Sequence, residues 1–299
     1  MNLIILKNFI AIVEAGSIRE AADNLHIAQS ALSRQIFALE REVGAPLLVR
    51  RARGVEPTEA GRILLRHARA AADQLSSAGA EIAAIQGLQS GFIRIAVIEP
   101  FATRPLPDCI ARFQASYPGI SFDVRVGNSR QITSLVREGV VDLGVAYNTP
   151  RDHEILLRTA VLQPTVAFVR PQHPLLARER VTLADFTDYP LILPPAGSPT
   201  RLLIDEAWRR AAVTPMRVGL ESDSVGLRLA MAQHTNSISI LALLSGRSSV
   251  DSGTLVELPF EDKLLSEGQL ELIAARGRMP SKATLEFERI LRSSMKTAL

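Results

Sequence analysis

Residues 17–61 read SIREAADNLHIAQSALSRQIFALEREVGAPLLVRRARGVEPTEAG, and this stretch decides the fold of the N-terminal part of the chain. Ser17 and Glu20 have the spacing of a capping box, in which each side chain bonds to the other residue's backbone N–H where a helix begins. Leu25-His26-Ile27 interrupts the helical spacing of apolar residues, which then restarts. The stretch therefore predicts a short helix, a turn and a second helix, followed by an arginine-rich hairpin and a further helix.

The second of these helices has two different faces. Its apolar face consists of Ala31, Leu32, Ile36, Leu39 and Val43, and the opposite face carries short polar and arginine side chains. Such a helix suits the major groove of DNA, where glutamine pairs with adenine and arginine with guanine through two hydrogen bonds. We expect bases or phosphates to be contacted by Gln29, Ser30, Ser33 and Arg34. The alternative is a solvated helix face without a partner.

The hairpin places Arg50, Arg51 and Arg53 within four residues. The net charge of the chain is only +3, which is too small to indicate a nucleic-acid partner by itself. The clustering of three positive charges in the hairpin is the informative feature. Contact with the DNA backbone or the minor groove needs positive charge and little sequence detail. We expect the three arginines to make such contacts; the alternative is a charged loop without a partner.

The same stretch resembles the winged helix-turn-helix of LysR-type transcriptional regulators. The residues that carry the resemblance are Ala21-Ala22, Ser33-Arg34-Gln35-Ile36, Leu39-Glu40, Val43-Gly44-Ala45-Pro46-Leu47 and Thr58-Glu59-Ala60-Gly61. Leu48 and Pro57 depart from the pattern, because the family usually has Phe and Leu there. The resemblance implies a transcription factor that binds specific sequences of double-stranded DNA.

A long helix should follow the hairpin, from Thr58 as its cap to about residue 88. Apolar residues recur in it in steps of four and three, which is the heptad seam of a coiled coil. The seam consists of Leu64, Ala68, Ala71, Leu75, Ala78, Ile82 and Ile85. A helix of roughly 45 Å with one apolar side is too long for a small domain. We expect it to pair with its copy in a homodimer or homotetramer.

Strand-like and helical segments alternate from residue 92 to the C-terminus, which points to a parallel α/β sheet. This region resembles the effector-binding domain of the same family, most clearly at LVREGVVDLGV over residues 135–145. The resemblance implies the two-lobed fold of periplasmic solute-binding proteins. The expected units are a DNA-binding domain over 1–57, a linker helix over 58–90 and an effector domain over 91–299. Within it, one lobe would comprise 91–163 and 268–299, and the other 164–267.

Polar side chains follow three of the expected strands, where ligands of open α/β sheets bind. Two of these segments also open helices, and helix N-termini favour anions. In the family, residues at these positions hold a small, usually anionic, effector. The resemblance assigns this role to Ser129 and Ser198, and also to Phe101, Thr103 and Arg201. The alternative for each serine is an ordinary helix cap.

Several classes of protein find no support in the sequence. No apolar run is long enough for a membrane span, and no secretion signal is apparent. Cys109 is the single cysteine, which fits a reducing cytoplasm. The five histidines lack metal-binding spacing, and no nucleophile elbow, P-loop or dinucleotide motif is present. We therefore expect a cytoplasmic, non-enzymatic regulator without metal or cofactor. The alternatives, an enzyme or a solute receptor on the same fold, leave the helix-turn-helix unexplained.

Overall fold

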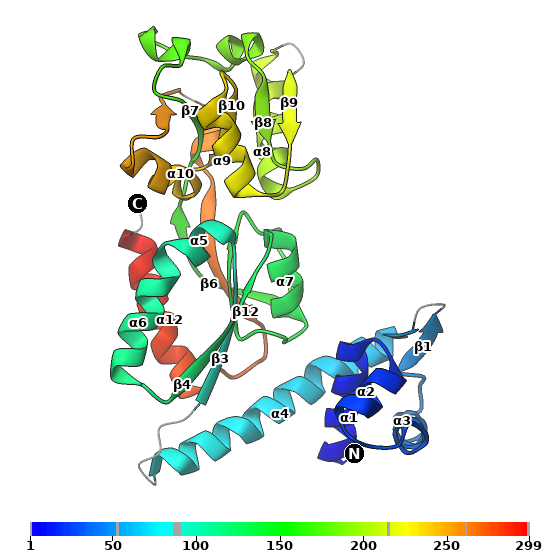
Figure 1. Cartoon of the computed structure of the whole chain (residues 1–299). Coiled ribbons are helices and arrows are strands. Elements are labelled where there is room, and N and C mark those ends of the chain that lie inside the picture. The colour runs from blue at the N-terminus through cyan, green and yellow to red at the C-terminus, as the bar shows by residue number, and fades with distance from the viewer. Residues whose placement is uncertain (1, 52–53, 86–90, 214–215, 261, 298–299) are drawn as a thin grey trace.

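The computed structural model describes residues 2–51, 54–85, 91–213, 216–260 and 262–297. Figure 1 shows a small N-terminal helical domain at one end of a long helix, α4, and two α/β lobes. One lobe lies next to α4, and the other lies beyond the first, away from α4. The fold therefore consists of the three parts that the sequence predicts: a winged helix-turn-helix, a linker helix and a two-lobed domain.

The N-terminal domain packs three helices under a two-stranded hairpin. Its elements are α1 (Leu3–Ala15), α2 (Ile18–Asn24), α3 (Gln29–Val43), β1 (Leu48–Arg51) and β2 (Gly54–Pro57). The Ser17 Oγ caps α2 by accepting the Glu20 N–H at 3.4 Å. The apolar faces of the helices form one core, which includes Phe9, Ile12, Leu32, Ile36 and Leu39. Leu32, Ile36 and Leu39 of α3 are thus buried, whereas Val43 at the end of the helix is 38% exposed, contrary to its expected place on the apolar face.

Helix α4 (Glu59–Ile85) begins against the hairpin. The Thr58 Oγ1 accepts the Gly61 N–H at 3.0 Å and donates to the Pro46 carbonyl at 2.7 Å. A Cβ on Gly61 would lie 2.0 Å from the Leu47 carbonyl oxygen, so only glycine allows this close approach. The start of α4 is therefore fixed to the N-terminal domain.

Lobe I is a sheet with the strand order β4-β3-β5-β12-β6. Its strands are β3 (Gly91–Val97), β4 (Ile120–Val126), β5 (Leu143–Tyr147), β6 (Ile155–Leu162) and β12 (Gln269–Ala275). Its helices are α5 (Glu99–Thr103), α6 (Pro105–Ser116), α7 (Ser129–Arg137) and α12 (Lys282–Thr297). Helices α6 and α12 cover one face and α7 the other, with Phe113, Phe287 and Ile132 among the buried side chains (Figure 1).

Lobe II is a second sheet, with the order β11-β7-β10-β8-β9. Its strands are β7 (Thr165–Val169), β8 (Leu191–Leu193), β9 (Val218–Glu221), β10 (Ile238–Ala242) and β11 (Val256–Leu258). Its helices are α8 (Pro199–Ala211), α9 (Val225–His234), α10 (Leu243–Asp251) and α11 (Lys263–Ser266), with 3₁₀ turns at Pro174–Ala177 and Leu183–Asp188.

Both sheets are mixed, which corrects the expected purely parallel arrangement. In lobe I, β3 pairs in parallel with β4 and β5, while β12 is antiparallel to β5 and β6. The reason is topological: the chain leaves lobe I after β6 and re-enters it at β12, so these neighbouring strands run in opposite directions. In lobe II, β7 is antiparallel to both β10 and β11.

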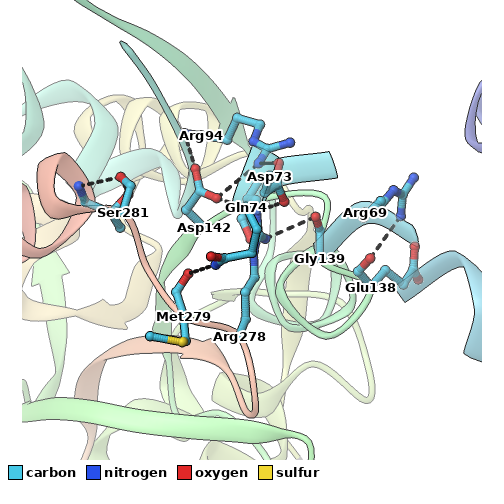
Figure 2. Close-up of polar contacts among 12 residues, drawn as sticks. Arg69, Asp73, Gln74, Arg94, Glu138, Gly139, Asp142, Arg278, Met279 and Ser281 are labelled. Carbon is cyan, nitrogen blue, oxygen red and sulfur yellow. Dashed lines mark hydrogen bonds and ion pairs between the residues drawn. The ribbon is translucent and has the colours of Figure 1, made fainter. Parts of the chain in front are cut away.

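Lobe I also holds the linker helix through a set of charged side chains, shown in Figure 2, which we call the linker clasp: Asp73, Arg94, Asp142 and Arg278. Asp73 of α4 pairs with Arg94 at 2.5 Å and with Arg278. Asp142 pairs with the same two arginines, at 3.2 and 2.6 Å. Burial lowers the pKa of Arg94, but the two carboxylates outweigh it and the pKa is raised. Both arginines of the clasp are therefore neutralised within the chain.

Arg69 adds a second attachment one turn away on α4. Its guanidinium is buried, donates to the Glu138 carbonyl at 3.0 Å and pairs with Glu14 of α1 at 3.1 Å. Gln74 donates to the Met279 carbonyl at 3.1 Å (Figure 2). One polar face of α4 is thus docked on lobe I.

Candidate functional site

The polar face of α3 is available to a partner. Gln29, Ser30 and Arg34 are exposed, and Ser33 is half-buried. The Arg34 side chain makes no hydrogen bond or ion pair with any described part of the chain. A helix held by its apolar side, with unpaired polar side chains in its first two turns, is the arrangement that major-groove recognition requires.

The hairpin presents part of the expected arginine cluster. Arg50 is exposed and has no ion-pair partner among the described residues. Arg51 pairs with Glu56 at 3.2 Å, with both side chains more than half exposed. Such a surface pair contributes little to stability, so Arg51 can exchange Glu56 for a phosphate at small cost. Arg53 lies outside the described residues.

The apolar side of α4 is exposed over part of the expected seam. Leu75 is 55% exposed, and Ala71 and Ala78 are exposed as well. Leu64 and Ala68 are covered by the same chain, and the side chains of Ile82 and Ile85 lie outside the described part. At about 100° per residue, the exposed seam lies on the side of α4 opposite the clasp. One helix therefore docks on lobe I with one face and leaves an apolar stripe on the other.

A cavity of about 540 Å³ lies between the two lobes. Lobe I contributes the ends of β3, β4 and β5 and the start of α7, and lobe II contributes the starts of α8 and α9 and the end of β10. Arg130 bridges the lobes by donating to the Gly197 carbonyl at 3.2 Å, and Arg104 pairs with Asp251 at 2.7 Å. A second cavity, of about 180 Å³, lies under the clasp. The arginines along that smaller cavity are all paired, whereas the inter-lobe cavity gathers strand ends and helix starts.

Ser129 and Ser198 both line the inter-lobe cavity, one from each lobe. The Ser129 Oγ accepts the Tyr147 N–H at 2.9 Å, and the Ser198 Oγ accepts the Arg201 N–H at 3.3 Å. An oxygen that accepts a backbone N–H still has its own O–H to donate. Each serine therefore keeps a structural hydrogen bond and retains a donor for a ligand.

The structure puts the other three expected effector residues away from the cavity lining. Phe101 is 0% exposed and packs in the core of lobe I. Thr103 donates to the Glu99 carbonyl at 3.1 Å. Arg201 pairs with Asp205 and Glu221, each at 2.8 Å. Burial lowers the pKa of Arg201, but the two carboxylates outweigh it, so the pKa is raised. We propose no ligand contact for these three.

Arg228 of α9 lines the same cavity, and sequence reasoning did not single it out. Its side chain is 5% exposed, and its Nε and Nη1 have no hydrogen-bond partner. Burial lowers the pKa of Arg228 to about 10, opposed in part by the charges of Glu99 and Asp223. The only sequence signal was one arginine among the apolar residues of Val225–Ala232, a pattern that also fits a helix with one solvated charge.

Two family models match the chain. That of the bacterial regulatory helix-turn-helix proteins of the lysR family covers residues 4–62, and that of the LysR substrate binding domain covers residues 86–296. This chain belongs to the LysR family. It is a LysR-type DNA-binding transcriptional regulator with an effector-binding domain, as the sequence predicts.

Related proteins agree with this assignment. The SDS degradation transcriptional activation protein of Pseudomonas sp. (strain ATCC 19151) is 30% identical over 283 residues, covering 93% of this regulator and 91% of the relative. Full-length CbnR complexed with its target DNA aligns with a TM-score of 0.62 at 22% identity, covering 98% of this chain and 100% of CbnR. The regulatory domain of CcmR from Synechocystis PCC6803, in complex with 2-PG, aligns with a TM-score of 0.61 at 24% identity, covering 69% and 98%. The two structural matches show a shared fold.

Two kinds of feature are absent from the part of the chain that the structure describes. No helix within the described ranges is long and apolar enough to cross a membrane. The described residues also contain no group of three or more histidine, cysteine, aspartate or glutamate side chains that could hold a metal ion.

Proposed function

We propose that this regulator binds DNA as a dimer-based unit and responds to a small anionic effector held between its lobes. Residues 1–57 form the DNA reader, 58–90 the dimerising linker, and 91–299 the effector domain. The observation that carries the proposal is the inter-lobe cavity, whose lining includes the starts of α7, α8 and α9. Helix N-termini present backbone N–H groups and a positive dipole end, which favour an anion.

The effector connects the lobes because the cavity draws its walls from both. Ser129 on lobe I and Ser198 on lobe II each retain a hydroxyl donor for it. A ligand that binds both lobes favours one inter-lobe arrangement over the others, and only to the extent that it binds that arrangement better. The clasp fixes α4 to lobe I, so a change between lobes of a dimer reaches the two DNA readers through the linker helices. The CcmR regulatory domain, which has the same fold, forms a complex with 2-PG, and this supports a small-molecule effector for the present chain.

Sequence-specific DNA binding is tested by selecting duplexes from a random pool with the full-length protein. We expect enrichment of paired half-sites spaced by whole helical turns. On the selected site, Arg34→Ala should weaken binding by about 1–3 kcal/mol if Arg34 reads a guanine. Arg209→Ala is the matched control, because Arg209 is an exposed arginine of lobe II that pairs with Glu206. A pool without an enriched sequence, or equal affinities of the two variants, would contradict the proposed DNA contacts.

A further inference from the structure

Among the described residues, two arginines are buried, and they differ in their surroundings. Arg69, 8% exposed, pairs with Glu14 and donates to a backbone carbonyl. Arg228, 5% exposed, has neither a carboxylate within 4 Å nor any hydrogen-bond partner for Nε and Nη1. Arg170 and Arg292 also leave Nε without a partner, but neither lines the inter-lobe cavity. Burying an unpaired charge is expensive, so an unpaired guanidinium at a cavity wall requires a compensating function.

Arg228 faces the cavity because of its place on α9. It is the fourth residue of the helix, and helical side chains lean towards the N-terminal end of their helix. That end consists of Ser224, the cap, and Asp223 before it, and both line the cavity. The free N–H groups therefore lie at the start of α9, where the helix dipole also favours negative charge.

We infer that Arg228 is the residue that anchors the effector, by binding a carboxylate or phosphate group through two parallel hydrogen bonds. This inference rests on the proposed function and adds to it the recognition residue and the chemical group it recognises. The planar fork of a guanidinium matches two oxygens of a planar carboxylate or of a phosphate. The hydroxyls of Ser129 and Ser198 provide further donors around the same cavity.

Glu99 opposes this anion. It comes from lobe I, lines the cavity, and its Oε1 lies 3.9 Å from the position of a Cβ on Gly226 of α9. Its charge and that of Asp223 act on Arg228 without forming an ion pair. Glu99 and Asp223 are exposed and offset the positive charge of Arg228 only from a distance. An oxyanion bound to Arg228 would neutralise that charge by direct contact. Removal of the Glu99 charge should therefore strengthen anion binding, an effect that a purely structural arginine would not produce.

The test is a titration of the full-length protein with sulfate, and separately with acetate, followed by the thermal midpoint at constant ionic strength set with chloride. We expect saturable stabilisation of the wild type and a loss of affinity of about 10- to 100-fold in Arg228→Gln. Arg228→Lys keeps the charge without the fork and should fall between them. Glu99→Gln should bind about 2- to 5-fold more tightly. Arg209→Gln, on the exposed side of lobe II, should match the wild type.

Three results would overturn the inference: no saturable effect of sulfate or acetate on the wild type, equal affinities of wild type and Arg228→Gln, or a midpoint of anion-free Arg228→Gln well below that of Arg209→Gln. The last would mean that Arg228 serves the fold. Each of these leaves the proposed function standing if the wild type still selects a specific DNA sequence. Failure of that selection would instead reject the proposed function, whatever the anions do.

Discussion

The linker clasp and the inter-lobe cavity both remove arginines from water, but they satisfy them differently. In the clasp, Arg94 and Arg278 meet Asp73 and Asp142 (Figure 2). In the cavity, Arg228 meets no carboxylate within 4 Å. Paired charges hold one arrangement of helix and lobe, whereas an unpaired charge at a cavity wall favours an incoming anion. The presence or absence of a partner, more than the residue type, therefore separates a structural arginine from a ligand-binding one.

A substitution that disrupts the seam of α4 and leaves the clasp intact should have the largest effect, which is on the oligomeric state and on DNA binding. Leu75→Asp puts a charge into the exposed apolar stripe, where pairing with a second copy would bury it at high cost. We expect loss of the oligomer and of binding to paired half-sites, while the clasp on the opposite face keeps α4 docked. Light scattering gives the mass in solution. Leu75→Met, which changes the same position without adding a charge, is the control, and an unchanged mass of Leu75→Asp would refute the seam.

Alkaline pH should distinguish Arg228 from the arginines of the clasp. Its effect on stability and on anion binding should be smaller than the effect of the seam substitution. The pKa of Arg228 is lowered to about 10 by burial, whereas that of Arg94 is raised by its carboxylates. Above about pH 10, folded Arg228 releases a proton that the unfolded chain retains, so its contribution to stability rises with pH. Anion binding should change in the opposite sense, because the neutral side chain attracts no anion. Sulfate keeps its charge throughout this range, so its affinity should be constant from pH 7 to 9 and fall near 10. A constant affinity up to pH 11 would contradict the assignment.

Local patterns in the sequence were sufficient for the N-terminal domain and the linker. The capping residues Ser17 and Thr58 are confirmed as caps, and three of the five residues expected on the apolar face of α3 are buried. These features depend on residues three to seven apart, which a single sequence displays directly.

Elements that depend on distant partners were harder to predict. Helix α10 contains Gly246 and three serines, which are poor helix formers, and it was not predicted. A Cβ on Gly246 would lie 2.3 Å from the Phe168 ring, so packing against β7 explains the glycine. The short strand β11 was missed as well, and it exists because it pairs with β7.

The effector site shows the same limit. Ser129 and Ser198 follow strands, begin or cap helices and line the inter-lobe cavity, while their contact with an effector stays a prediction. Arg201 looked equally suitable, although Asp205 four residues later was a signal for a pair within its own helix. The unpaired state of Arg228 could not be predicted from the sequence. It depends on which residues from several distant segments lie around the guanidinium, and only the fold determines this.

The most direct test of this contrast is one substitution made at two arginines. Arg278→Gln and Arg228→Gln remove the same charge from two largely buried side chains, and urea unfolding of the anion-free protein measures the free energy of unfolding of each. Arg278→Gln should lose about 2–3 kcal/mol, because Asp73 and Asp142 remain with only Arg94. Arg228→Gln should be as stable as the wild type or up to about 1 kcal/mol more stable, because an unpaired buried charge is removed. Equal losses in the two variants would show that both arginines serve the fold and would contradict the distinction between clasp and cavity.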